Sequence, residues 1–440
     1  MDTGEAARAW GPSAGDFLRP LEWRWSRFAR ATTGAKGDWR AFSGSSGRIV
    51  TLPQDEAKAL GPIRQAGTAK VHLAGPARML AEAEALVSSD TDEIALAASR
   101  FMSFAARQER HLVLFANRRA LGKREDMDPS VATAVKRLID REGSAVTKFT
   151  ITWLGWRPML SLAQMLDITT YAQACCRKTG ASFTASLRGS GSPLSAESLS
   201  ALFHAGVKHV DLFWRGGLST LEDDLKAAGI QECGASVLLR VTSRVSQELR
   251  WRLTAIPGVE LTGDGQPNNR SAGTLESSLA DGNRLRLAGA ARRLLPFGTM
   301  CHAADPRTIT VGVDGVLHRC TVALKDPANA VGALLPSGDL AWSEAKLARW
   351  LEPWALRHNG CHDCCLLPSC YGNACPLYRL STGRAPCPND LYSLDSVLAS
   401  DASGTDSPLP PCAASDGCRS VPKSMTLRRR VRRERIVVVY

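Results

Sequence analysis

Cysteine is missing from the first part of this chain: none precedes Cys175, and a Cys-x3-Cys-x2-Cys pattern occurs nowhere in it. No run approaches the roughly 18 apolar residues of a membrane-spanning helix, so we expect no membrane association. Residues 1–20 lack a basic segment followed by an apolar stretch, which argues against a secretory signal and favours a cytoplasmic location. In a reducing compartment, clustered cysteines favour metal sites over disulfides.

The length of 440 residues allows two or three domains. The net charge is +12, and part of it comes from a run of arginines between Arg428 and Arg435. Such a run can touch nucleic acid or an acidic partner. Ser, Gly, Asp and Pro are frequent just before it, so residues 393–440 predict a flexible, solvated basic tail. Nucleic acid is therefore not an expected partner.

A regular alternation of strands and helices is predicted between residues 108 and 290. A helix is expected from Asp128, as its cap, and Pro129, and another from Ser219 with Glu222 as a capping box. Residues 263–290 predict a loop region. The predicted strands are His111–Phe115, Phe149–Leu154, Ser182–Leu187, His209–Trp214, Ser236–Val241 and Val259–Leu261. Strands separated by helices at this spacing predict a parallel sheet. The expected α/β fold is an open, partial (β/α)6 barrel.

The amino-terminal region, residues 1–107, is more mixed. Trp39–Leu60 predicts a short hairpin followed by a helix. Glu93–Arg107 predicts a helix, because Ile94, Ala98, Phe101 and Phe104 follow a helical period.

Eight of the thirteen cysteines lie between Cys301 and Cys387. Their order is Cys301, Cys320, Cys361, Cys364, Cys365, Cys370, Cys375 and Cys387. Staggered thiolates suit iron–sulfur clusters, although a Cys-x2-Cys pair also suits tetrahedral zinc, and both remain open. Few apolar residues accompany them, so we expect metal ligation to supply much of this segment's stability.

The remaining cysteines have simpler interpretations. Cys175 and Cys176 fall within a predicted helix, and Cys233 precedes a predicted strand, so all three are expected to be core residues. Cys412 and Cys418 fall in the predicted tail and are assigned no role.

The cysteine-rich segment resembles the SPASM domain, the auxiliary iron–sulfur module of radical SAM peptide- and protein-modifying enzymes. The turn 313–320 around Gly315 and the central stretch 361–372 carry the resemblance. It implies two [4Fe–4S] clusters: Cys301, Cys320 and Cys375 for the first, and Cys361, Cys364, Cys370 and Cys387 for the second. Four residues, rather than the family's usual three, separate Cys370 from Cys375. The first set has only three thiolates, so Cys365 or His302 could complete it, or one iron site could be open.

The resemblance also implies that residues 108–290 correspond to a radical SAM core, whose cysteine motif follows the first strand. The positions of those cysteines here fall on Ala116, Ala120 and Lys123, although Asn117 matches the family. The family's Gly-Gly-Glu-Pro motif is represented by Gly155, Trp156, Arg157 and Pro158. A third landmark, Asp-Gly, is represented by Arg215-Gly216. An arginine opposes the ammonium of S-adenosylmethionine, so binding of this cofactor is not expected, and no catalytic residue is assigned.

The predicted domains are 1–107 (possible peptide recognition), 108–290 (degenerate radical SAM-like barrel), 291–392 (SPASM iron–sulfur domain) and 393–440 (tail). The favoured function is an accessory or scaffold protein in the maturation of a ribosomally made peptide, with a precursor peptide or partner maturase as ligand. One alternative is an active iron–sulfur oxidoreductase or peptide-modifying enzyme that uses the SPASM clusters. Another is a zinc-binding or nucleic-acid-binding module.

Overall fold

The computed structural model describes residues 21–33, 38–58, 60, 68–71, 73–120, 123–190, 195–214, 221–241, 246–263, 294–385 and 387. The predicted tail, most of the predicted loop 263–290, Ser219 and the Arg215-Gly216 pair lie outside these residues. The chain folds into two compact units, each assembled from segments far apart in sequence. The described part of the cysteine unit comprises residues 21–104, 294–301 and 352–387, and that of the sheet unit comprises 105–263 and 302–351. The predicted domains, by contrast, are continuous stretches of chain.

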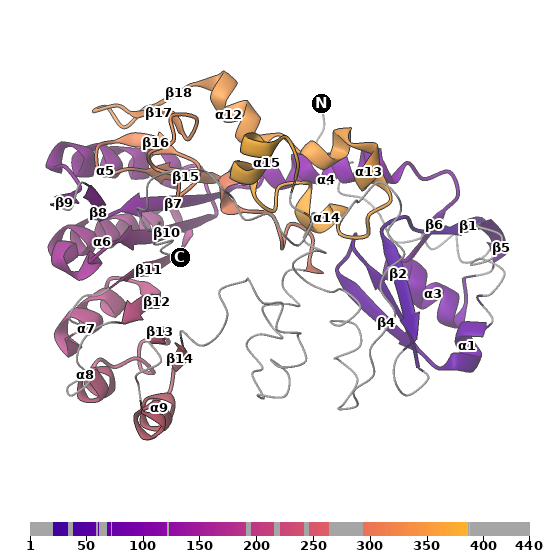
Figure 1. Ribbon diagram of the computed structural model, residues 1–440, viewed down its shortest axis with the longest axis horizontal. Coiled ribbons are helices and arrows are strands. Elements are labelled where there is room, and N and C mark those ends of the chain that lie inside the picture. The colour runs from indigo at the N-terminus through magenta and orange to yellow at the C-terminus, as the bar shows by residue number, and fades with distance from the viewer. Residues whose placement is uncertain are drawn as a thin grey trace. The chain divides into compact units, whose positions relative to one another are not determined.

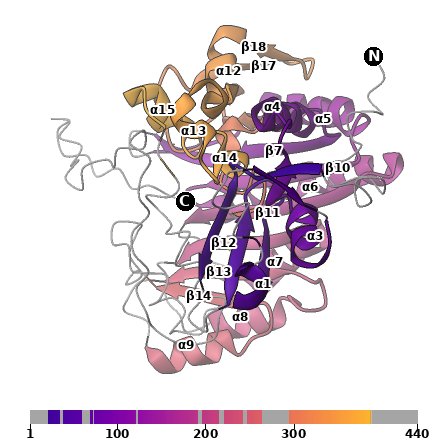
Figure 2. The same cartoon turned by 90° about the vertical axis from the view of Figure 1, so that its right-hand side faces the viewer.

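The sheet unit is built on a ten-stranded sheet of order β14-β13-β12-β11-β10-β7-β15-β16-β17-β18. Its first six strands pair in parallel, and all six were predicted from the sequence. They are β7 (Glu109–Phe115), β10 (Lys148–Gly155), β11 (Ser182–Ser190), β12 (Val207–Trp214), β13 (Ser236–Val241) and β14 (Val259–Gly263). Figure 2 shows β10 to β14 following one another across the sheet. The predicted α/β class with a parallel sheet is therefore confirmed.

Helices α5 to α9 lie on one face of this sheet (Figure 1). They are α5 (Pro129–Gly143), α6 (Leu162–Thr179), α7 (Ala196–His204), α8 (Leu221–Ala227) and α9 (Gln247–Thr254), with the short η1 (Pro158–Ser161) ahead of α6. Asp128 caps α5 as predicted, because its carboxylate accepts from the backbone N–H of Ser130. Val135, Leu138 and Ile139 bury the helix face against the sheet unit's core.

The sheet does not end at the last predicted strand. Strand β15 (Thr308–Val311) pairs in parallel with β7, on the side opposite β10. Strands β16 (Val316–His318), β17 (Ala330–Leu334) and β18 (Leu340–Trp342) then add in antiparallel order, and η2 (His302–Ala304) and α12 (Glu344–Leu351) flank them. The first part of the cysteine-rich segment therefore extends the βα sheet.

The cysteine unit holds two small sheets, of order β5-β1-β6 and β2-β3-β4. The strands are β1 (Leu21–Trp25), β2 (Ala29–Thr33), β3 (Trp39–Ser43), β4 (Arg48–Leu52), β5 (Thr68–Val71) and β6 (Leu86–Ser88). The helices are α1 (Gln54–Lys58), α3 (Gly75–Glu82), α4 (Glu93–Ala105), α13 (Asn359–His362), α14 (Leu367–Cys370) and α15 (Pro376–Thr382), with the short η3 (Trp354–Arg357). The predicted hairpin-plus-helix is confirmed as β3, β4 and α1, and the predicted helix at Glu93 as α4, although Ala97 rather than Ala98 is buried on it.

The cysteine-rich stretch 352–387 packs against amino-terminal elements of the same unit. One apolar cluster joins Phe28, Phe101, Leu367 and Tyr371, and a second joins Phe42 with Leu366 and Leu294. The expectation that this stretch has little apolar surface to bury is therefore wrong. Its apolar side chains pack against side chains from residues 21–105. The composition of residues 352–387 alone cannot predict these contacts.

Among the described residues, no helix is both long and apolar enough to cross a membrane.

Candidate functional site

The two faces of the parallel sheet differ in chemistry. Side chains that point toward helices α5 to α9 are apolar and buried, such as Leu112, Ile151 and Leu187. The alternate residues point to the other face and are largely polar, as the period of two in a strand requires. We call these residues the polar face: His111, Thr150, Thr152, Thr184, Ser186, Arg188, His209, Asp211, Ser236, Arg240, Glu260, Thr308, Thr310 and His318. The sequence carried the signal for this face, because polar residues recur at every second position of the predicted strands.

A hydrogen-bonded chain crosses three strands of the polar face. The Nε2 atom of His111 lies 2.8 Å from Thr152 Oγ1, which lies 2.9 Å from Ser186 Oγ. The pKa of His111 is lowered to about 4, first by burial and then by the nearby His302, Arg188 and Arg307, against the opposing effect of Asp305. Burial likewise lowers the pKa of His302 to about 4, with Arg319 and Arg188 contributing. Both imidazoles are therefore neutral near pH 7, and the cations of this region are arginines.

Two further features complete the polar face. Asp211 accepts a bidentate pair of hydrogen bonds from Arg240, at 2.7 and 2.8 Å, and the side-chain hydrogen bond to Asp211 raises the pKa of Arg240. On the β15 side, the hydroxyls of Thr308 and Thr310 and the ring of His318 are buried without a hydrogen-bond partner among the described residues. Because buried polar groups normally have partners, this end of the face is suited to holding water or a polar ligand.

The loop after β7, where the resemblance implies three cluster ligands, forms a β-hairpin. Strand β8 (Asn117–Ala120) pairs with β9 (Lys123–Asp126), so Ala120 lies opposite Lys123. Ala116 lies at the base of the hairpin, where its carbonyl accepts from the N–H of Met127. Ala120 follows Ala116 by four steps of extended chain, about 13 Å at roughly 3.3 Å per step.

Asn117 holds the loop that follows β10. Its Oδ1 accepts from the backbone N–H groups of Trp156 and Arg157, and its Nδ2 donates to the carbonyl of Arg157 and to Ser161 Oγ. Asn117 is fully buried. A Cβ atom at Gly155 would lie 3.0 Å from Asn117 Oδ1 and 3.1 Å from Pro158 Cβ, which explains the glycine there. The backbone of Trp156 and Arg157, which lie at positions of the family's Gly-Gly-Glu-Pro motif, is thus held in place by Asn117.

The side chains on this loop are cationic and aromatic. The guanidinium carbons of Arg157 and Arg119 lie 4.6 and 5.0 Å from the centre of the Trp156 ring. Both arginines are exposed and Trp156 is half-buried. Arg119 was not singled out by sequence reasoning, because its proximity to Trp156 depends on the hairpin.

The four cysteines assigned to the second cluster all lie in the cysteine unit. Burial raises the pKa of Cys370 well above its usual range, and the nearby thiols of Cys364, Cys361 and Cys387 raise it further, while the backbone N–H of Gly372, 3.3 Å from Cys370 Sγ, opposes the shift. Cys361, Cys364 and Cys387 are therefore near enough to Cys370 to act on its charge, and the donor chemistry of the four thiols fits a cluster. No group of three or more His, Cys, Asp or Glu residues among the described ranges is arranged to hold a metal ion. The assignment of these four cysteines to one cluster therefore stays a prediction.

The three cysteines assigned to the first cluster are divided between the units. Cys301 and Cys375 belong to the cysteine unit, where the N–H of Cys301 donates to the carbonyl of Asn373 at 2.9 Å. Cys320 belongs to the sheet unit and is buried, with its backbone bracketed by the side-chain amide of Asn329. This set stays a prediction.

The prediction that Cys175, Cys176 and Cys233 are core residues is confirmed only in part. Cys176 is fully buried in α6 as predicted. Cys175 and Cys233 are only partly buried, so their assignment to the core is wrong. Cys175 instead lies one position away from the buried face of α6, and its thiol donates to Asp140 at 3.3 Å.

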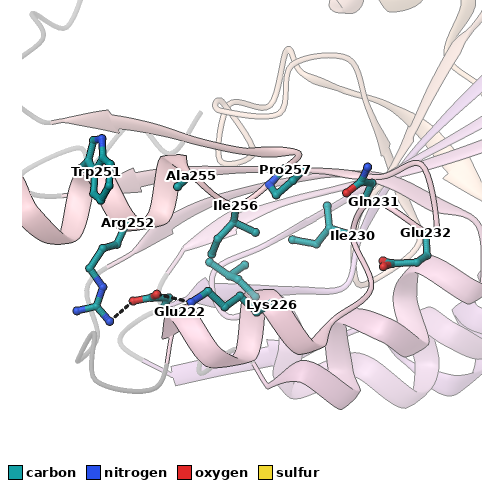
Figure 3. Close-up of a pocket in the computed structure, with 11 residues that line it drawn as sticks. Glu222, Lys226, Ile230, Gln231, Glu232, Trp251, Arg252, Ala255, Ile256 and Pro257 are labelled. Carbon is teal, nitrogen blue, oxygen red and sulfur yellow. Dashed lines mark hydrogen bonds and ion pairs between the residues drawn. The ribbon is translucent and has the colours of Figure 1, made fainter.

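A hollow of about 310 Å³ lies between α8 and α9 of the sheet unit (Figure 3). Ile230, Ile256 and Pro257 line it, and Trp251 at its edge is 73% exposed. Glu222 pairs with both Lys226 and Arg252 on its other side. Together with Glu232, which also lines the hollow, these charges sum to zero, so the hollow offers apolar contact without a distinguishing charge.

Comparison with known proteins yields no family for this chain. No family model matches it, and no curated protein does. Among solved structures, the chain is similar to anSMEcpe with bound AdoMet (12% identity, 58% of this chain, 88% of that chain, TM-score 0.39). It is also similar to BtrN in complex with AdoMet and 2-DOIA (11%, 51%, 77%, 0.30) and to the tryptophan synthase alpha chain from Legionella pneumophila subsp. pneumophila (13%, 59%, 98%, 0.24). Likeness at these scores carries no argument about family or function.

Proposed function

We propose that this chain is a radical SAM/SPASM-like protein whose barrel has lost its S-adenosylmethionine site, and that it acts as an accessory or scaffold in the maturation of a ribosomally made peptide. The observation that carries the proposal is the hairpin β8–β9. It replaces a ligand loop with a paired structure in which Ala116 and the Ala120–Lys123 pair lie at opposite ends. Even with thiols there, one cluster could not collect all three.

The electrostatics of the neighbouring loop support the same conclusion. Arg157 stands where the resemblance expects a carboxylate for the cofactor's ammonium, and Asn117 fixes the backbone of Trp156 and Arg157 with three hydrogen bonds. A cation held in place opposes an ammonium ligand. The residues present at this loop therefore do not fit S-adenosylmethionine.

For the auxiliary clusters the donor set fits. Cys361, Cys364, Cys370 and Cys387 would hold one [4Fe–4S] cluster, and Cys301, Cys320 and Cys375 would hold the other. Such a cluster supplies cross-linking of the chain and, when its iron changes oxidation state, electron transfer. The protein's own contribution is the buried site of Cys370 and the N–H of Gly372 directed at its sulfur.

Peptide binding is supported by the sheet β2-β3-β4. Among the described residues, β2 and β4 each pair only with β3, so each has a second edge to which an extended peptide could add as a strand. We infer that this module receives the precursor peptide or a partner maturase.

The experiment that tests the proposal is metal and sulfide analysis of anaerobically purified protein, combined with calorimetric titration of S-adenosylmethionine. We expect bound iron and acid-labile sulfide and no heat of cofactor binding. Cys370→Ser should lower the iron and sulfide content, whereas Cys233→Ser, outside the cysteine-rich segment, should leave both unchanged. Zinc in place of iron would convert the proposal to a zinc-binding module. Cofactor binding, or release of 5′-deoxyadenosine under reduction, would overturn the loss of the barrel site.

A further inference from the structure

Two arginine side chains share one indole at the loop after β10. Arg119 comes from β8 and Arg157 from the segment between β10 and η1, and both guanidinium groups lie over Trp156, at 5.0 and 4.6 Å. An arginine that stacks on an aromatic ring is pre-organised, and it keeps its N–H donors at the ring's edge free to bind. We call these three residues the arginine mouth.

Arg119 and Arg157 differ from Arg118 and Arg124 in whether a carboxylate lies beside the guanidinium group. Arg118 pairs with Glu125 at 2.7 Å and Asp314 at 3.0 Å, and Arg124 pairs with Asp126 at 2.7 Å. Among the described residues, no carboxylate lies within ion-pair distance of Arg119 or Arg157. The register places Arg119 opposite Arg124, on the hairpin side of Asn117 and Asp126, both of which bond to Ser161. Arg119 and Arg157 are therefore two guanidinium groups that form no ion pair with another described residue, whereas Arg118 and Arg124 do.

We propose that the arginine mouth binds the carboxylates of an acidic segment in a peptide partner. The proposal rests on the peptide-binding function proposed above and names the class of sequence that it recognises. A guanidinium group matches a carboxylate with two parallel N–H···O bonds. Because both guanidinium groups already stack on Trp156, part of the side-chain freedom is lost before the ligand binds.

A peptide suits this surface better than a nucleic acid does. Glu125, Asp126 and Asp314 pair with Arg118 and Arg124 on the same hairpin that carries Arg119. A continuous phosphate backbone gains affinity by covering many cations in a row, and these carboxylates would repel it. A short peptide segment needs only one or two carboxylates to pair with Arg119 and Arg157.

The test is fluorescence anisotropy with a labelled peptide of alternating Glu and Gly, its Gln-containing analogue, and a single-stranded DNA oligonucleotide as competitor. The full chain is compared with an Arg119→Gln/Arg157→Gln double variant. Arg177→Gln, an exposed arginine near the end of α6, is the matched control for the loss of positive charge. Circular dichroism melting establishes that each variant is folded. An Arg119→Lys/Arg157→Lys double variant keeps both positive charges but removes the planar guanidinium groups that stack on Trp156.

We expect the acidic peptide to bind, the Gln analogue not to bind, and the double Gln variant to bind about tenfold more weakly or worse, since hydrogen bonds to charged groups are the strong ones. Arg177→Gln should bind like the parent, and the Lys variant should fall between. Equal binding by the double Gln variant would overturn the proposal while leaving peptide binding in place. Displacement by the oligonucleotide at lower concentration than by unlabelled peptide would overturn it in favour of nucleic acid. Absence of any acidic-peptide binding would also overturn it, whereas the iron and cofactor measurements decide the proposed function independently.

Discussion

The hydroxyl of Tyr371, the residue after Cys370, donates a hydrogen bond to the backbone carbonyl of Ala97 in α4 at 3.2 Å. The Tyr371 ring stacks on Phe297 with centroids 5.0 Å apart and tilts against Phe101 at 5.2 Å. Tyr371 is fully buried. This contact links the cysteine-rich stretch to the amino-terminal helix of the same unit, so the two segments should lose their structure together.

We predict that Tyr371→Phe lowers the free energy of unfolding of the cysteine unit by about 1 kcal/mol, through loss of one hydrogen bond. Tyr371→Ala should cost about 3–5 kcal/mol, because it also leaves a cavity among aromatic rings. Chemical denaturation measures both. Tyr378→Phe in α15, where the tyrosine is only half-buried, is the control and should change stability little. An equal effect of the two Phe variants would contradict a role for the hydroxyl of Tyr371.

Gly44 gives a second test of the same packing. A Cβ atom at this position would lie 1.8 Å from the carbonyl oxygen of Cys365 and 3.2 Å from that of Phe28. Both obstacles are backbone atoms, which cannot rotate away. Gly44→Ala should therefore displace the Cys365 segment and lower the melting temperature of the protein. Gly143→Ala, at the end of α5 with nothing within 4 Å of the added methyl group, should be neutral or slightly stabilising. If both variants melt alike, residues 44 and 365 do not pack as described.

Much of the sheet unit could be predicted because its signals are local. Most of the parallel strands alternate apolar and polar residues between helical segments, and the α5 cap is specified by Asp128 and Pro129 alone. The pairing of β15 with β7 could not be predicted, because nothing near Thr308 specifies a partner two hundred residues earlier. The same limit applies to the packing of Leu367 and Tyr371 on α4.

Part of the candidate site could also be predicted from the sequence, because some of its signals are local. The departures at Ala116, Arg157 and their neighbours are visible as residue types, and the cysteine spacing is visible as a pattern. The hairpin that separates Ala116 from Ala120 is a backbone arrangement, and the approach of Arg119 to Trp156 depends on its register. Tertiary contacts of this kind decide what a loop can bind, and periodicity does not report them.

The hairpin makes restoration of the family's motif a sharp test. We predict that the triple variant Ala116→Cys/Ala120→Cys/Lys123→Cys gains no third iron–sulfur cluster on reconstitution and does not cleave S-adenosylmethionine. The physical reason is the pairing of β8 with β9, which keeps residue 116 about 13 Å from residue 120 along the strand. Iron and sulfide per chain, compared with the parent protein, measure the outcome. A gain of four irons per chain would show that the hairpin yields readily and that only the thiols are missing.

His111 should make the stability of the sheet unit depend on pH. Its pKa is lowered from 6.5 to about 4 in the folded chain, first by burial and then by His302, Arg188 and Arg307. Between these two values the unfolded chain takes up a proton that the folded chain does not, so unfolding becomes easier as the pH falls. The contribution of the neutral His111 to the free energy of unfolding is fully present above pH 6.5 and lost by about pH 4. Each pKa unit corresponds to about 1.4 kcal/mol, so the upper limit is about 3 kcal/mol.

We predict that denaturation measured between pH 7.5 and 5 shows a falling free energy of unfolding in the parent protein and a shallower fall in His111→Gln. The glutamine cannot take up a proton, so it removes this residue's share while His302, whose pKa is also lowered to about 4, keeps its own. His204→Gln, at the exposed end of α7, is the matched control and should retain the full slope. The loss of slope in His111→Gln isolates the buried imidazole from the carboxylates that titrate in the same experiment. A slope unchanged by His111→Gln would mean that burial and the neighbouring charges do not lower the pKa of the His111 imidazole in the folded chain.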